Sequence, residues 1–351
     1  MDERDLRHLL AVAAGTAAPP TALSERTLRR VSVRAATLLV VVTGVILGLL
    51  IPTTILVLNT SRATVQPISS LPSPSQQTGN PALPQMSSGS VLFRTYANHQ
   101  PGLAGAKTSD GSVVGYPAAQ PATGIAVSPE GDEVAFNETI DVSQGALAIF
   151  DISSGEIKRI VSDLGGLNGP AWSAPRDEIL FATGRGDIYT VRPDGSNLTL
   201  LKEAAGAVEV SWSPDGKEIA YSTHEGDVWV VTLSNLSTRQ VWHRSLGFGS
   251  WPSWSPTEPV LAIQAVDPES QVREVHLVST SENSSLQPVT LNVGRDVFEP
   301  SWTPDGEFLL VSARTPDSND RDIYAIRLTD TSLQLVAGTP QEDSVPRFIG
   351  E

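Results

Sequence analysis

The sequence predicts an all-β fold, a six-bladed β-propeller, preceded by a single transmembrane helix. Two observations support this prediction. A phrase close to Trp-Ser-Pro-Asp-Gly recurs five times between residues 120 and 310, and an uncharged apolar stretch separates this repeat region from a weakly basic N-terminal segment. Repeats of about 40 to 45 residues that each hold four short strands are typical of propeller blades.

Each repeat is marked by one bulky residue followed by turn residues. The gaps between successive markers are 45, 40, 42 and 48 residues. A large aromatic side chain can fill the space between neighbouring blades, and Pro-Asp-Gly favours a tight turn because Pro presets φ and Gly accepts a positive φ. The alternating residues after each turn predict a half-buried strand. The markers are Val127, Trp172, Trp212, Trp254 and Trp302.

The C-terminus indicates how the ring closes. Pro346-Arg347-Phe348 repeats the phrase Pro-x-aromatic, with Phe348 placed 46 residues after Trp302. A sixth inner strand at this position needs three partner strands, which residues 90–96 and 103–116 can supply. Such closure joins both ends of the repeat region in one blade and leaves no long open edge. We therefore expect six blades rather than five or seven.

The repeated Trp-Ser-Pro-Asp-Gly phrases, together with Asp-Ile-Tyr at 187–189 and 322–324, resemble the TolB-like (WD40-like) family of propeller repeats. The resemblance spans residues 90–350 and implies the propeller fold and a bacterial source. It does not specify a function, because propellers serve many. The first copy lacks Trp, the second reads Ala-Pro-Arg-Asp and the fourth reads Pro-Thr-Glu-Pro, so we expect less regular hairpins there.

The charge of the chain is divided by a membrane-spanning pattern. The net charge is −15, but residues 1–34 carry six Arg and four acidic residues, and residues 35–61 carry no charge. A helix of about 24 residues rises roughly 36 Å, enough to cross a hydrocarbon core of about 30 Å. Arg29, Arg30 and Arg34 flank one end, which favours a cytoplasmic N-terminus. A cleaved signal peptide is the alternative, but its apolar region is only about 7 to 15 residues long.

These patterns predict four segments of a bacterial cell-membrane protein. They are a cytoplasmic tail (1–34), a transmembrane helix (35–59), a Pro/Ser-rich disordered linker (60–89) and the extracytoplasmic propeller (90–351). Extended, the linker reaches at most about 90 Å. In the tail, Leu6, Leu9 and Leu10 are candidates to dock a cytoplasmic partner, and the alternative is a tail that only sets the topology.

Composition excludes several kinds of chemistry. The acidic balance argues against nucleic acid as a partner. The chain has no Cys, which rules out disulfides, thiolate metal sites and cysteine nucleophiles. The five His residues form no metal-spaced pair, and no Gly-x-Ser-x-Gly elbow occurs. Residues 317–320 resemble half of a calcium loop but lack its Gly and distal Glu, so we expect a solvated loop. We therefore predict no catalytic residues, no metal and no cofactor.

A candidate binding site lies where the inner strands begin. The residues three positions before the markers include Glu209, Trp251 and Glu299, which together can form an acidic and aromatic patch at the channel mouth. Acids that only keep the channel hydrated are the alternative. We expect a scaffold or sensor that binds a cell-envelope protein, peptide or glycan. The alternative is an enzyme, such as a metal-dependent lactonase or lyase, acting at the channel.

Overall fold

The computed structural model describes residues 86 and 88–350, with short gaps. The gaps are 98–99, 117–118, 121–123, 141–143, 203, 205, 244–247, 282–287, 292, 294–295, 315–319 and 340–341. The predicted tail, the transmembrane helix, most of the linker and the core of the half calcium loop lie outside these residues. Within the residues that are described, no helix has the length and apolar character needed to span a membrane.

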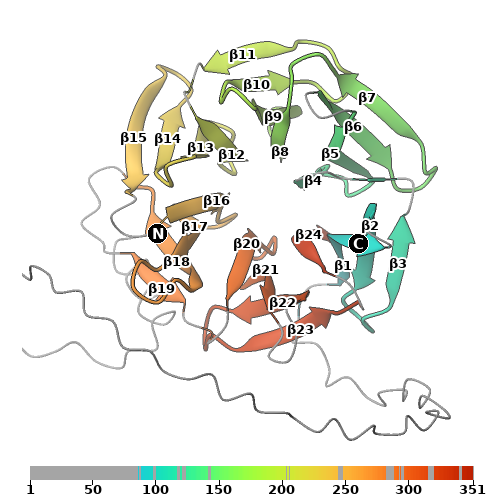
Figure 1. The fold of residues 1–351 in the computed structure, drawn as a ribbon, viewed down its shortest axis with the longest axis vertical. Coiled ribbons are helices and arrows are strands. Elements are labelled where there is room, and N and C mark those ends of the chain that lie inside the picture. The colour runs from blue at the N-terminus through green and yellow to red at the C-terminus, as the bar shows by residue number, and fades with distance from the viewer. Residues whose placement is uncertain are drawn as a thin grey trace, which may run out of the picture. The chain divides into compact units, whose positions relative to one another are not determined.

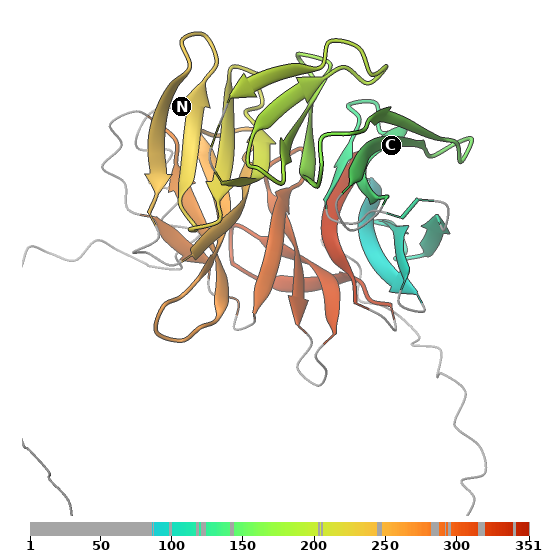
Figure 2. The same ribbon diagram turned by 45° about the horizontal axis from the view of Figure 1, so that its top comes forward.

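The described chain forms six four-stranded antiparallel sheets arranged as blades around a ring (Figures 1 and 2). Each blade has an inner strand beside the central channel and three strands that follow outward. The inner strands are β4 (Ile125–Val127), β8 (Leu167–Ser173), β12 (Ala207–Trp212), β16 (Phe248–Trp254), β20 (Val297–Trp302) and β24 (Ser344–Gly350). The second strands are β5 (Glu133–Thr139), β9 (Glu178–Thr183), β13 (Glu218–Thr223), β17 (Val260–Val266), β21 (Phe308–Arg314) and β1 (Gly89–Ala97).

The outer half of each blade completes the sheet in the same order. The third strands are β6 (Gly145–Asp151), β10 (Ile188–Val191), β14 (Val228–Thr232), β18 (Arg273–Ser279), β22 (Arg321–Arg327) and β2 (Gln100–Lys107). The outermost strands are β7 (Ile157–Val161), β11 (Thr199–Lys202), β15 (Ser237–Trp242), β19 (Val289–Leu291), β23 (Leu333–Ala337) and β3 (Val113–Tyr116). We number as blades 1 to 5 the sheets that begin with β4, β8, β12, β16 and β20, and call β24-β1-β2-β3 the closing blade.

The predicted closure is confirmed. The C-terminal strand β24 pairs with β1, from Gly89 opposite Gly350 to Arg94 opposite Ser344. The remaining strands of the closing blade, β2 and β3, follow β1 directly in the chain. Six blades are therefore present, and the two ends of the described chain are joined by hydrogen bonds within one sheet.

The repeated turn owes its shape to one hydroxyl and one carboxylate. In blade 3, Ser213 Oγ donates to Asp215 Oδ1 at 2.8 Å and accepts from the backbone N–H of Glu218 at 2.9 Å. Gly216 takes φ +66° in the same turn, a conformation that glycine adopts without strain. The second copy has no Gly at its turn, and Asp177 takes φ +51° there. The turn residues therefore set the path from the inner strand to the second strand.

The apolar core is divided into six clusters, one at each junction between neighbouring blades. Trp212 of blade 3 packs with Leu180 and Ala182 of blade 2, and it is 6% exposed. Trp254 of blade 4 packs in the same way with Val228 and Val230 of blade 3. The marker side chains are thus wedges between blades, as the repeat pattern predicted. A blade cannot bury its faces without a neighbour on each side.

Removal of β24, by deleting residues 344–351, is therefore expected to destabilise the propeller severely. The deletion exposes the edge of β1 and the cluster around Val91 and Phe93, and we expect it to remove much of the roughly 5–15 kcal/mol that stabilises a typical domain. Thermal unfolding followed by circular dichroism measures the effect. Val114→Ala, at an exposed position of β3 in the same blade, is the control and should melt like the unmodified protein. An unchanged melting temperature after the deletion would contradict closure by β24.

Candidate functional site

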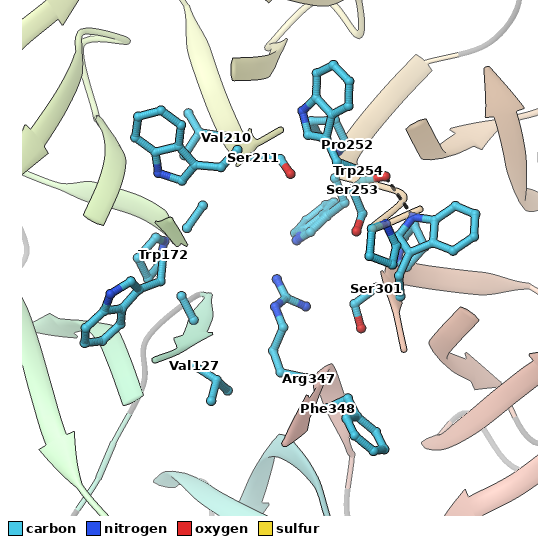
Figure 3. A pocket seen from close by; sticks show the side chains of 18 of the residues that line it. Val127, Trp172, Val210, Ser211, Pro252, Ser253, Trp254, Ser301, Arg347 and Phe348 are labelled. Carbon is cyan, nitrogen blue, oxygen red and sulfur yellow. Dashed lines mark hydrogen bonds between the residues drawn. The ribbon is translucent and has the colours of Figure 1, made fainter. Parts of the chain in front are cut away.

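A cavity of about 290 Å³ lies at the centre of the ring, and residues of all six inner strands line it (Figure 3). Among its lining residues are Glu209 and Trp251, two of the three residues that the sequence pointed to, and Arg347. Trp251 is half-buried. The third, Glu299, is not one of the lining residues. The lining of the cavity combines apolar aromatic side chains with one carboxyl group and one guanidinium group.

A repeated irregularity of the inner strands positions these side chains. The pairing of each long inner strand with its second strand shifts register at the same place, as between Ser250 and Ser253 and between Phe298 and Ser301. The shifted segments hold Trp251 at φ +48°, Glu299 at φ +56° and Val345 at φ +54°. Positive φ is uncommon for residues other than glycine, and such bulges redirect a side chain. At three of the positions three before a marker, those of Trp251, Glu299 and Val345, the backbone is therefore specialised as well as the side chain.

Glu209 is 9% exposed, and its carboxyl group lies against blade 2. A Cβ atom on Gly169 would stand 2.4 Å from Glu209 Oε2, so only glycine leaves room for this carboxyl group. The pKa of Glu209 is raised to about 8, mainly by burial, with a smaller contribution from the charge of Glu299, and against the opposing charges of Arg347 and Arg94. At neutral pH the side chain is therefore mostly an uncharged carboxylic acid that can donate a hydrogen bond.

Glu299 has a different environment although its position in the repeat is the same. Its Oε2 accepts hydrogen bonds from Ser312 Oγ at 2.7 Å and from the backbone N–H of Val345 at 2.8 Å. Its Oε1 lies 3.5 Å from Nη1 of Arg321. Val345 belongs to β24, so Glu299 ties blade 5 to the closing strand. This carboxylate is 4% exposed and its oxygens face protein donors.

Arg347 is the functional candidate that the sequence reasoning missed. It stands on β24 directly before the marker Phe348, and its side chain is directed into the middle of the cavity (Figure 3). Its Nη1 donates to the carbonyl oxygen of Pro346 at 2.8 Å. The signal was present in the sequence, because the other five copies have a small residue directly before the marker. These residues are Ala126, Ala171, Ser211, Ser253 and Ser301, and all of them line the cavity.

The other sequence candidates do not gather at the cavity. Of the five His residues, His8 and His99 lie outside the described residues, and His224, His243 and His276 are not among the residues that line the cavity. In the described ranges no group of three or more His, Asp or Glu residues is placed to hold a metal ion.

The raised pKa of Glu209 predicts a specific dependence of stability on pH. Between its ordinary value of 4.5 and about 8, the folded protein keeps a proton that the unfolded chain gives up. The stability of the folded state therefore falls as the pH rises through this window. Glu209→Gln removes this part of the decline, so its melting temperature should exceed that of the unmodified protein by several degrees at pH 9 and by little at pH 5. Glu130→Gln, at an exposed turn, is the control. Parallel curves for the unmodified protein and Glu209→Gln would contradict the assignment.

The fold occurs in proteins of very different function. No model of a known protein family matches the sequence, and no curated protein matches it either. TolB from Acinetobacter baumannii superposes with a TM-score of 0.63 at 18% identity, over 75% of this chain and 67% of that chain. Hydrazine synthase of Kuenenia stuttgartiensis gives a TM-score of 0.61 at 12% identity, over 74% of this chain and 46% of that chain. A chain of a nidogen/laminin complex gives 0.56 at 13% identity, over 70% and 92%. At these identities the likeness establishes the architecture alone, and the chain has the six-bladed propeller fold that it shares with TolB.

Proposed function

We propose that the chain is a membrane-anchored, extracytoplasmic propeller that binds a protein of the cell envelope by taking a short peptide segment of it into the central channel. The observation that carries the proposal is the cavity, which all six blades line and whose lining includes Trp251, Glu209 and Arg347. Aromatic residues and Arg are the residue types enriched where proteins recognise one another. An aromatic surface gives a peptide side chain apolar contact, and the polar groups fix its orientation.

The dimensions of the cavity favour a peptide segment over a folded surface. A volume of about 290 Å³ accommodates one or two amino-acid residues and excludes a packed domain. Any larger contact with the partner protein is then made outside the cavity, by the loops on the face of the ring. A propeller of the same architecture forms part of a nidogen/laminin complex, which supports the use of this fold for binding proteins.

The proposed location follows from the sequence. The uncharged segment 35–59 is long enough to span a bilayer, the three Arg residues before it favour a cytoplasmic N-terminus, and the Pro-rich segment 60–89 holds the propeller away from the lipid surface. A tethered propeller of this kind acts as a scaffold, or as a sensor if the cytoplasmic tail has a partner of its own.

The topology is tested with reporters fused after Glu351 and expressed in bacteria. We expect alkaline phosphatase, which needs an oxidising compartment, to be active in this fusion, because the positive-inside rule places the C-terminus outside. A reporter that works only in the cytoplasm should be inactive at the same position and active when fused before Met1. The reverse pattern would overturn the orientation.

Binding is tested by selecting a random heptapeptide phage library against the full-length protein in detergent micelles. We expect enriched peptides whose affinity falls at least tenfold in Trp251→Ala, because truncation removes the aromatic wall of the cavity. Val114→Ala, on the outer edge of the closing blade, should bind them like the unmodified protein. If no peptide is enriched, or if enriched peptides bind Trp251→Ala with undiminished affinity, the channel is not the binding site.

A further inference from the structure

At the position directly before the markers, small side chains from five blades leave space in the channel around a single guanidinium group. Five of the six residues that directly precede the markers are Ala or Ser, and the sixth is Arg347. Because these positions lie at equivalent places on six inner strands, the small residues form the wall that the Arg347 side chain faces (Figure 3). A larger residue in another blade would fill the volume that the guanidinium group now faces.

The guanidinium group has spare hydrogen-bonding capacity. Arginine carries five N–H donors, and Arg347 gives one hydrogen bond, from Nη1 to the carbonyl oxygen of Pro346. Among the described residues, no carboxylate lies within 4.0 Å of it as an ion-pair partner. Arg347 is half-buried, and a guanidinium group with unused donors in a cavity offers an incoming anion charge-assisted hydrogen bonds.

The nearby carboxyl groups form no ion pair with this guanidinium group. The charge of Glu299 acts on Arg347 from a distance, but its hydrogen bonds go to Ser312 and Val345 and its ion pair to Arg321. Glu209 is mostly protonated at neutral pH, because burial raises its pKa to about 8. The groups that act on Glu209 are Arg347 on β24, Glu299 on β20 and Arg94 on β1. The cavity therefore offers a positive charge beside a neutral acid.

We propose that the cavity is a carboxylate site, in which the guanidinium group of Arg347 binds one carboxylate of the peptide that enters the channel. This inference rests on the proposed function. A planar guanidinium group matches a carboxylate in shape and forms two parallel hydrogen bonds with it, and one cation balances one carboxylate. The carboxylate comes either from the chain end of the peptide or from an Asp or Glu side chain. Protonated Glu209 lines the same cavity, and its carboxylic acid can donate a further hydrogen bond to this ligand.

The arrangement makes binding dependent on pH in a defined direction. As the pH rises through about 8, Glu209 ionises and repels a bound carboxylate. Between pH 7 and pH 9 the protonated fraction of such a group falls about tenfold, so the affinity should fall by about the same factor. Glu209→Gln stays neutral and should bind the carboxylate with little change over this range.

Three small probes test the proposal with the full-length protein in detergent micelles. They are acetyl-Ala-Ala with a free carboxylate, acetyl-Asp-amide with a side-chain carboxylate, and acetyl-Ala-Ala-amide with neither. Affinity is measured by titration with ligand-observed nuclear magnetic resonance. We expect at least one acid to bind ten times more tightly than the uncharged amide, and the acid that binds better identifies the source of the carboxylate.

Two variants separate recognition from folding. Arg347→Gln should reduce binding of the acid at least tenfold, whereas Arg159→Gln, an equal change of charge at an exposed arginine on the outermost strand β7, should not. Ser211→Leu keeps Arg347 but fills the wall of the cavity, and it should weaken binding to the same extent. Melting curves confirm that each variant is folded. Equal binding of acids and amide, no binding of either acid, or undiminished binding by folded Arg347→Gln would overturn the carboxylate site.

Failure of the carboxylate site can be distinguished from failure of the proposed peptide binding. Library peptides that need Trp251 but not Arg347 would leave peptide binding in place and refute the carboxylate site. Small acids that need Arg347, without any enriched library peptide, would leave the carboxylate site in place and refute peptide binding.

Discussion

Closure of the ring is the constraint on which the rest of the structure depends. Each of the six apolar clusters lies between two neighbouring blades, so every blade needs a neighbour on both faces to be buried. The two junctions of the closing blade depend on a sheet that β24 completes, with its other three strands taken from the beginning of the repeat region. The same strand supplies Val345 to the cluster with Leu92 and Phe136, and Phe348 to the cluster with Val91. A C-terminal strand of seven residues thus stabilises the whole ring.

The same ring geometry creates the central cavity, and a few residues of the chain specialise its lining. Six inner strands bring equivalent positions together, so a change in one repeat faces five unchanged copies. Gly169 gives space to the carboxyl group of Glu209, and Glu299 accepts the N–H of Val345 instead of facing the cavity. Arg347 departs most from its equivalents. Two acids at the same position of the repeat therefore differ in chemistry, one mostly neutral in the channel and one occupied by the closing strand.

Most of the fold could be predicted from the sequence, because it is periodic. The markers and turn residues recur, and each copy supports the interpretation of the next, so the blades and the partners of the C-terminal strand followed from spacing. The site was harder to predict, because it depends on exceptions. Glu209, Trp251 and Glu299 stand three positions before their markers. Arg347 was missed because it stands directly before its marker, two residues further along the strand, where the other five copies have Ala or Ser. The partners of Glu299 could not be predicted, since they come from β21, β22 and β24. The desolvation of Glu209 likewise depends on distances that no spacing reveals.

The place of β1 in the closing blade has a mechanical consequence. β1 lies between β24 and β2, and its first residue, Gly89, is where the preceding segment joins the ring. A force on that segment directed along the strand loads the hydrogen bonds to both neighbours at once, in shear, rather than opening them one after another. Tension applied at Gly89 is therefore resisted by two ladders in parallel. One of these ladders is formed by β24, so tension along β1 acts on the same strand that carries Arg347 into the channel.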